Sequence, residues 1–128
     1  MTIEEKRKYR RLILGIDDGY FGNFKLDNDE SLVAPIVNIS AGGLNMAAPT
    51  QTGSRLKEGD RLVLASIAGG TNFAFMNDIP SEVRWVKQLE TPGYISVGCE
   101  FTSIPEAVRE QLIRFVDSER MTRGQYNG

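Results

Sequence analysis

"YISVGCEF", residues 94–101, carries the clearest strand pattern in the sequence, because apolar and polar side chains alternate along it. The alternation divides the stretch into one set containing Ile95, Val97, Cys99 and Phe101 and another containing Tyr94, Ser96, Gly98 and Glu100. Successive side chains of a β-strand point to opposite faces. The first set is therefore predicted to lie in a core, and the second to face solvent or a groove.

Similar short segments, rich in β-branched, Leu and aromatic residues, recur along most of the chain. Turn-forming residues separate them at "LDNDES" (26–31), "KEGD" (57–60), "AGGTN" (68–72) and "ETPG" (90–93). This pattern predicts an antiparallel sheet or barrel. The expected strands span residues 11–16, 19–26, 31–38, 43–48, 61–68, 82–89 and 94–101.

One long helix is predicted near the end of the chain, in "SIPEAVREQLIRFVDSERM" (103–121). Ser103 and Glu106 have the spacing of a capping box, and Pro105 is expected in the first turn, where its missing N–H costs little. An apolar stripe at helical spacing is expected to pack on the sheet, and it consists of Val108, Leu112, Phe115 and Val116.

The length of 128 residues suits one domain with its own core. We expect a mobile basic arm at residues 1–12, a folded unit at 13–121 and a frayed polar tail at 122–128. No apolar run approaches the roughly 20 residues that cross a bilayer, and no secretory signal is recognisable. A cytoplasmic location without membrane insertion is the resulting expectation.

The chain contains no histidine and a single cysteine, Cys99. Nucleophilic systems that need histidine and the usual zinc sites are therefore excluded, and Cys99 is interpreted as a small core residue. Asp17–Asp18 and the acidic run at 27–30 do not match the calcium-loop pattern, so they are interpreted as solvated turns. We expect no catalytic residue, no metal and no cofactor, and look for a binding function instead.

The basic charge is concentrated in "EKRKYRRL" (5–12). Residues 1–12 carry a net charge of +3, whereas the whole chain carries −2. Such local charge suits a small anionic ligand better than a long nucleic acid, whose binding requires many basic contacts. Arg7 and Arg11 have R-x-x-x-R spacing, so two guanidiniums can reach one ligand and contact phosphate or a guanine edge. The alternative is a solvated face that contacts anions without specificity.

A second motif lies in "VNISAGGLNM" (37–46), where Asn38, Ser40 and Gly43 follow the order N-x-S-x-x-G. Asn and Ser provide hydrogen-bonding groups, while the Gly42–Gly43 pair permits positive φ and the close approach of a ligand to the backbone. An ordinary hairpin turn remains the alternative for this motif.

The RxxxR arm followed by NxSxxG closely resembles the PilZ domain, a bacterial receptor family for the second messenger cyclic diguanylate (c-di-GMP). The segment "VRWVKQLETPGYISVGCEF" (83–101) is similar to the late strand pair of the family, and the terminal helix agrees in place and length. The resemblance implies a mainly β fold: a six-stranded antiparallel PilZ-type β-barrel with a C-terminal α-helix.

By resemblance, Arg7 and Arg11 clamp the guanines and phosphates of c-di-GMP. Lys6 occupies a position that is frequently Arg in the family and that influences whether one ligand or an intercalated pair binds. Lysine keeps the charge but loses planar stacking, which leaves the number of bound ligands open.

In the second motif, Asn38 stands where Asp is also common and can still hydrogen-bond a base edge. Ser40 and Gly43 match the family pattern, and Gly42 lies beside them in the same turn. Trp85 aligns with a strand aromatic that walls the ligand site. The alternative for Trp85 is a core residue that anchors the barrel.

The resemblance implies a non-enzymatic receptor that orders its arm on c-di-GMP and signals through an unidentified protein partner, with motility, adhesion or polysaccharide output as the process. Two alternatives stay open. One is a PilZ-like adaptor that binds only protein. The other is a small barrel that binds nucleic acid through the basic arm and shows strong dependence on salt.

Overall fold

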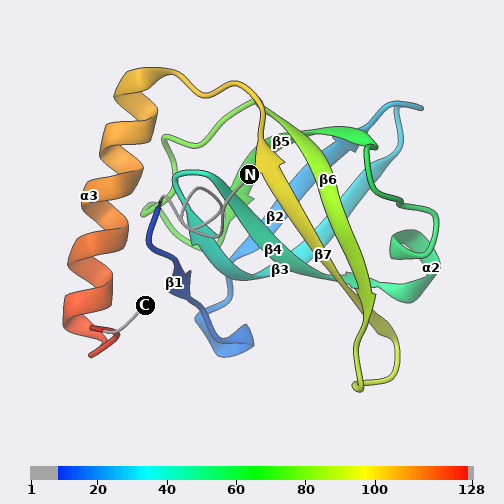
Figure 1. Ribbon diagram of the computed structural model, residues 1–128, viewed down its shortest axis with the longest axis horizontal. Coiled ribbons are helices and arrows are strands. Elements are labelled where there is room, and N and C mark those ends of the chain that lie inside the picture. Colours follow the sequence, from blue (N-terminus) through cyan, green and yellow to red (C-terminus); the bar gives the residue numbers. More distant parts are fainter. Residues whose placement is uncertain (1–8, 127–128) are drawn as a thin grey trace.

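Seven strands and one long helix make up most of the computed structural model, which describes residues 9–126 (Figure 1). The strands are β1 (Leu12–Ile13), β2 (Phe21–Leu26), β3 (Ser31–Ser40), β4 (Gly43–Pro49), β5 (Arg61–Ala68), β6 (Ile79–Gln88) and β7 (Tyr94–Phe101). The helical elements are η1 (Ile16–Asp18), α2 (Thr50–Gly53) and α3 (Glu106–Thr122). Every strand expected from the sequence is present.

All strand pairs are antiparallel, and six strands close a ring in the order β3-β2-β5-β6-β7-β4, with β4 pairing back to β3. The short β1 pairs with the C-terminal half of β3, while β2 pairs with its N-terminal half. β1 and β2 therefore share one position in the barrel wall. The predicted fold class, a mainly β six-stranded antiparallel barrel with a C-terminal helix, is confirmed.

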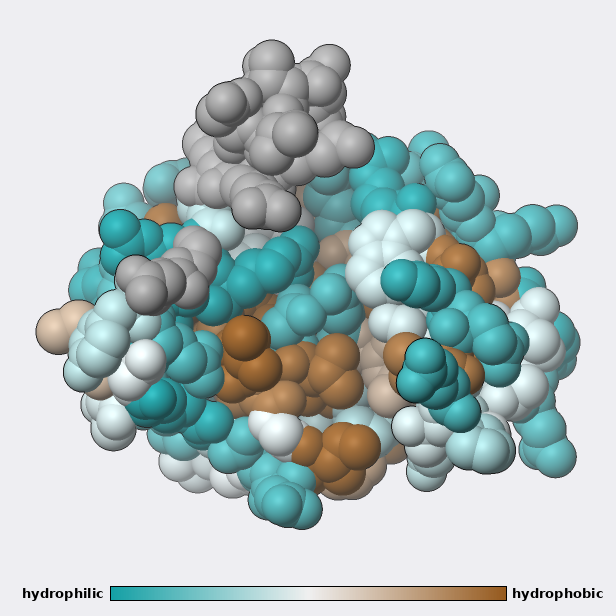
Figure 2. Space-filling view, turned by 60° about the horizontal axis from the view of Figure 1, so that its bottom comes forward, coloured by the Kyte–Doolittle hydropathy of each residue, from teal (hydrophilic) through white to brown (hydrophobic). Residues whose placement is uncertain are grey.

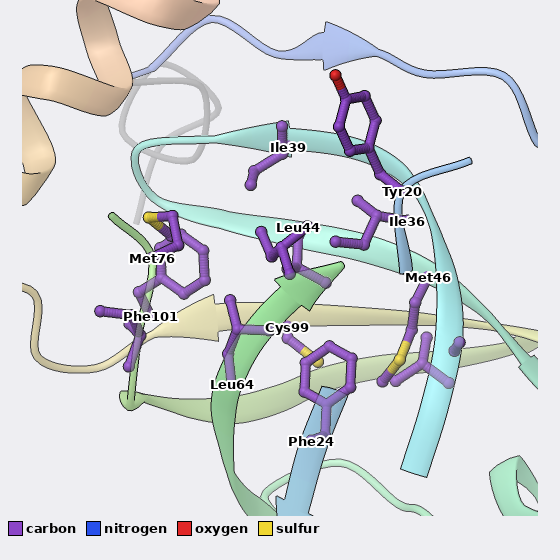
Figure 3. Packing of buried hydrophobic residues seen from close by; sticks show 14 of the residues in the cluster. Tyr20, Phe24, Ile36, Ile39, Leu44, Met46, Leu64, Met76, Cys99 and Phe101 are labelled. Atoms are coloured by element: carbon purple, nitrogen blue, oxygen red, sulfur yellow. The ribbon is translucent and has the colours of Figure 1, made fainter. Parts of the chain in front are cut away.

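The core fills the inside of the barrel with alternate side chains of each strand. On β7, the four apolar positions of the alternating pattern are all buried, as predicted. Figure 3 shows Cys99 among Phe24, Leu44, Met46 and Leu64 in this interior. Cys99 is a core residue, and burial raises the pKa of its thiol to about 12.

The first strand is shorter than predicted because short-range hydrogen bonds compete with pairing there. The first predicted strand, 11–16, is only Leu12–Ile13 in the structure, because the chain enters η1 at Ile16. There Asp18 Oδ2 accepts a hydrogen bond from the Gly15 N–H at 2.7 Å. Such side-chain-to-backbone bonds offer the chain an alternative to a strand.

β6 begins three residues earlier than predicted, at Ile79. β3 runs two residues further than predicted, to Ser40. The two polar members of the second motif, Asn38 and Ser40, therefore lie on a strand, and the turn itself is confined to Ala41 and Gly42.

The start of α3 also differs from the prediction. Pro105 is the N-cap residue, not a member of the first turn, and no side chain caps the helix. The capping box expected from Ser103 and Glu106 is therefore wrong. Pro105 has an extended ψ of 141°, so the helix begins only at Glu106, and the Pro105 carbonyl accepts its first hydrogen bond from Arg109.

The apolar stripe of α3 packs against β1 and β3, with Leu112 and Val116 buried and Val108 and Phe115 partly buried. β1 lies between α3 and the rest of the barrel (Figure 1). No helix within residues 9–126 is both long enough and apolar enough to span a membrane.

The outer surface of the barrel is chemically mixed. Figure 2 shows apolar side chains gathered near the middle of one face, with polar side chains around them. The large apolar residues that remain exposed include Ile13, Ile16 and Trp85. Some outward strand positions are thus apolar, and Trp85 is the one that belongs to a predicted binding site.

Candidate functional site

The hairpin between β3 and β4 forms the rigid part of the site. Ser40 is buried, and its Oγ accepts a hydrogen bond from the Gly42 N–H at 3.1 Å and lies 3.5 Å from the Gly43 carbonyl oxygen. Because Ser40 pairs with Gly43 across a two-residue turn, its hydroxyl holds the turn in shape. The turn is thus held by hydrogen bonds within the hairpin itself.

The positive φ predicted for the two glycines of this turn is wrong, and each glycine lies against a close neighbour. Neither Gly42 nor Gly43 has a positive φ. A Cβ on Gly43 would lie 2.1 Å from the Cys99 carbonyl oxygen on the neighbouring β7, which no side chain tolerates. A Cβ on Gly42 would lie 3.2 Å from the Tyr9 ring. Gly43 thus permits close strand packing, and Gly42 accommodates Tyr9, at the base of the basic segment.

One hydrogen bond joins the two predicted motifs. Arg11 Nη1 donates to Asn38 Oδ1 at 2.7 Å. Although Arg11 is exposed by area, the surrounding protein desolvates its guanidinium and lowers its pKa. An arginine nevertheless stays charged at neutral pH. The structure therefore places a fixed cation beside the polar strand end that carries Asn38.

A row of cross-strand partners extends from this pair around the outside of the barrel. Ile13 lies opposite Asn38, Asn38 opposite Asn45, Asn45 opposite Gly98, and Gly98 opposite Trp85. Residues directly opposite each other in an antiparallel sheet project to the same face. The row thus brings Asn38 and Trp85 onto one surface although they are far apart in the sequence.

The indole of Trp85 covers Gly98. A Cβ on Gly98 would lie only 2.2 Å from Cε2 of the indole and 2.3 Å from Nε1, so the absence of a side chain there makes room for the ring. Trp85 is 39% exposed and belongs to the outer face, which excludes the alternative of a core tryptophan. Its exposed ring face can stack on a planar group.

Sequence reasoning missed Asn45, which lies between Asn38 and Gly98 in this row and is partly exposed. The sequence contained the information needed to find Asn45. A two-residue turn at Ala41–Gly42 pairs Ser40 with Gly43, and two residues further along each strand it pairs Asn38 with Asn45. Counting back from the glycines would have found it. The contact between Tyr9 and Gly42 could not be found in this way, since it depends on tertiary packing.

Acidic side chains border the site on the β7 side. Glu100 lies opposite Gly43, and Arg84 binds both Glu100 at 3.0 Å and Glu82 at 2.9 Å. These ion pairs reduce the negative field that an anionic ligand would meet near the hairpin. Within residues 9–126, no group of three or more His, Cys, Asp or Glu side chains could hold a metal ion.

Of the predicted site residues, the structure brings Arg11, Asn38, Ser40 and Gly43 together, with Gly42 between them. Trp85 joins them through the cross-strand row. Lys6 and Arg7 lie outside the described residues.

Comparison with known proteins gives a family match. The model of the family described as PilZ domain matches residues 5–118, which is most of the chain. A search of the curated proteins produced no match.

Several solved structures share the fold. The PilZ domain of YcgR from Escherichia coli, solved with c-di-GMP, has a TM-score of 0.76 and 22% sequence identity, and the match covers 94% of this chain and 96% of that one. The K. pneumonia MrkH complex with c-di-GMP has a TM-score of 0.75 at 17% identity, covering 94% of this chain and 55% of that chain.

The Bacillus subtilis inhibitor of motility MotI/DgrA has a TM-score of 0.70 at 17% identity, covering 91% of this chain and 52% of that chain. The chain thus spans about half the length of MrkH and of MotI. At these identities the likeness demonstrates a common fold.

Proposed function

The chain belongs to the PilZ domain family, and from this premise we propose that it is a receptor for c-di-GMP. The observation that carries the proposal is the 2.7 Å hydrogen bond between Arg11 and Asn38, because it unites the arginine motif and the NxSxxG motif in one site. The c-di-GMP complexes of the YcgR PilZ domain and of MrkH, which share the fold, support this choice of ligand.

The chemistry of the site suits the two halves of such a ligand. A guanidinium such as that of Arg11 donates two parallel hydrogen bonds to phosphate or to a guanine edge. Asn38 offers an amide to a base edge, and the exposed ring of Trp85 offers a stacking surface. We assign Lys6 and Arg7 to the same ligand by their place in the motif. Binding involves no catalytic step.

The signalling part of the proposal concerns the basic segment. Residues Tyr9 to Leu12 are already anchored, since Tyr9 packs beside Gly42, Arg11 bonds Asn38 and Leu12 is buried. We propose that the ligand orders the residues before Tyr9, and that the ordered segment forms part of a surface for a protein partner. Control of motility or of biofilm output is the process we favour, and MotI, an inhibitor of motility, shares the fold.

The direct test is calorimetric titration of c-di-GMP into the wild type and the variants Arg11→Ala and Arg7→Ala. A hydrogen bond to a charged group contributes about 1.5–3 kcal/mol, so each variant is expected to bind roughly ten- to hundredfold more weakly. The barrel should stay folded, because Arg11 is exposed.

Arg114→Ala is the matched control, because Arg114 is exposed on α3 and its side chain makes no hydrogen bond or ion pair with any described residue. Unchanged affinity in either arm variant would refute the role assigned to that arginine. Binding of oligonucleotides that c-di-GMP does not displace, and that salt abolishes, would favour a nucleic-acid-binding barrel instead. A folded wild type that binds neither would favour the adaptor.

A further inference from the structure

The C-terminal end of α3 is joined to the segment that carries Arg11. Arg120 Nη1 donates a hydrogen bond to the main-chain carbonyl of Arg11 at 2.7 Å. Gln125 exchanges two hydrogen bonds with the main chain of Ile13, at 2.9 and 3.1 Å. Arg123 binds Asp18 with two hydrogen bonds of 2.9 and 3.0 Å. The residues of the N-terminal segment that receive these bonds are Arg11, Ile13 and Asp18, so the contacts extend from Arg11 to η1.

Arg120 is unusual among these three because it is only 4% exposed. It stands four residues after Val116 and eight after Leu112, so it continues the buried apolar stripe of the helix. An aliphatic side chain at this position would pack without the cost of removing a charge from water. Within the described residues its Nη2 has no hydrogen-bond partner, so the desolvation is only partly compensated. Stability alone does not explain an arginine here.

The position of the Arg11 carbonyl gives a better explanation for a buried arginine at position 120. The next residue, Leu12, is fully buried and pairs with Ile39, so the main chain is fixed on that side by β3. Arg120 fixes it from the other side, through the carbonyl of Arg11 itself. With the main chain held at both points, the side chain of Arg11 extends over β3 and reaches Asn38. β1 lies between α3 and the barrel in this arrangement (Figure 1).

We propose that Arg120 is a positioning residue for ligand binding: it holds the main chain of Arg11 so that the guanidinium is already directed at the site when the ligand arrives. The inference rests on the proposed function, since its consequence is an affinity for c-di-GMP. Holding a binding group in place before the encounter reduces the entropy lost on binding. Loss of Arg120 should therefore weaken binding although Arg120 itself does not touch the ligand.

The test compares Arg120→Met, which keeps the length of the side chain but removes its charge and donors, with Arg120→Lys, which keeps a charged donor. Arg114→Met is the matched control on the exposed face of the same helix. Affinity for c-di-GMP is measured by calorimetry well below the unfolding temperature of each variant. We expect the dissociation constant for c-di-GMP to rise about tenfold in Arg120→Met. In Arg120→Lys the rise should be at most half as large on a logarithmic scale. In the control the dissociation constant should stay unchanged.

A double-mutant cycle separates positioning from general support of the fold. If Arg120 acts through Arg11, Arg120→Met should cost no further affinity when Arg11 is already alanine. The proposal is overturned if Arg120→Met reduces the affinity for c-di-GMP equally in the Arg11→Ala and wild-type backgrounds. It is also overturned if Arg120→Met does not reduce the affinity in the wild-type background. Should Arg120→Met fail to fold, the same cycle is built with Arg120→Lys. Its smaller loss of affinity should appear in the wild-type background and be absent in the Arg11→Ala background.

A measurement without ligand distinguishes failure of this inference from failure of the proposed function. The NMR signals of the Arg11 guanidinium and of the Asn38 side-chain amide report their hydrogen bond directly. We expect both signals to change in Arg120→Met and to remain in Arg114→Met. If the wild type binds no c-di-GMP but these signals change as expected, the receptor function fails and the positioning of Arg11 stands. If they do not change, the positioning fails whatever the ligand.

Discussion

Gly98 illustrates how a residue without a side chain can shape a binding surface. It lies on the outer face of β7, between Asn45 on one neighbouring strand and Trp85 on the other. The indole of Trp85 fills the space that a Cβ would need, and Gly98 is buried beneath it. The ring can therefore lie along the sheet beside the polar row and not stand out into water.

We predict that Gly98→Val displaces the indole, because its Cβ would lie 2.2 Å from Cε2 of Trp85. Valine suits a strand, so the barrel should remain folded. Stacking of a base on an aromatic ring contributes about 1–3 kcal/mol, and its loss should weaken c-di-GMP binding roughly tenfold. Because Trp85 is the only tryptophan, its fluorescence emission reports the displacement without ambiguity.

Ser96→Val provides the control for this change, since Ser96 lies two residues away on the same face of β7. Emission and affinity should both stay at wild-type values in that variant. If Gly98→Val leaves the affinity unchanged while the emission shifts, Trp85 is not part of the ligand site.

The residues that follow α3 hydrogen-bond and pair with the first elements of the chain, β1 and η1. β1 has only two residues, and the outward N–H and carbonyl of Ile13 have no strand beside them. The Gln125 side-chain Nε2 donates to the Ile13 carbonyl, and its Oε1 accepts from the Ile13 N–H. A neighbouring strand would make the same two hydrogen bonds. Residues that were expected to fray thus hydrogen-bond the edge of β1, and Arg123 adds an ion pair to Asp18 in η1.

The Asp18–Arg123 pair gives a prediction about pH. The hydrogen bond from Arg123, with a further one from the Gly15 N–H, lowers the pKa of Asp18 below its ordinary value of 3.8. A carboxylate whose pKa is lowered by folding stabilises the native state above the unfolded pKa, and this contribution is lost as the pH falls through the folded pKa. At pH 7 the contribution is about 0.5–1 kcal/mol, because both side chains are partly exposed.

We therefore expect Asp18→Asn to be less stable than the wild type at pH 7, and this difference to be smaller at pH 3, as measured by urea unfolding at each pH. Asp17→Asn is the control, because the exposed side chain of Asp17 makes no hydrogen bond or ion pair within the described part of the chain. A stability difference between Asp18→Asn and the wild type that does not shrink at pH 3 would contradict the assignment.

Closure of the barrel creates a single buried interior. The alternating residues of β7 reach this interior beside those of β4 and β2, and Figure 3 shows Cys99 in the middle of the packing. Burial disfavours the thiolate, which explains why the pKa of Cys99 is raised to about 12. Only the thiolate reacts readily with disulfide reagents.

Cys99 thus provides a measure of the integrity of the barrel. We expect the native protein to resist labelling by an aromatic disulfide reagent at pH 8, and to release one equivalent of the coloured thiolate once it is unfolded in guanidinium. The chain has no other cysteine, so the stoichiometry is unambiguous. Labelling of the native protein as fast as that of the unfolded chain would show that the barrel opens readily and would contradict a closed core.

Most of the fold was predictable from the sequence, because the alternation of side chains is a local property. The bounds of β5 and β7 agree with the predictions, and the inward residues of β7 are those expected. The errors lie at element ends. The first strand stops early because Asp18 bonds back to Gly15, and α3 starts late because Pro105 is extended.

The candidate site was only partly predictable. The motif residues Arg11, Asn38 and Ser40 stand out by type and spacing, and the resemblance to the PilZ domain gave them a ligand. Asn45 was missed although the hairpin register places it, and Arg120 could not be identified, because in the sequence it is one arginine among several on a polar helix. The main-chain carbonyl that it contacts lies 109 residues away in the sequence.

Local patterns in the sequence identify the residues that face inward, the places of the turns and the chemical groups available for binding, because these depend on neighbours along the chain. Three contacts came only with the folded structure: Arg11 with Asn38, Trp85 with Gly98, and the buried Arg120 of the last helix with the main chain of Arg11. These contacts arise when barrel closure brings distant strands into register, and no local pattern encodes that geometry.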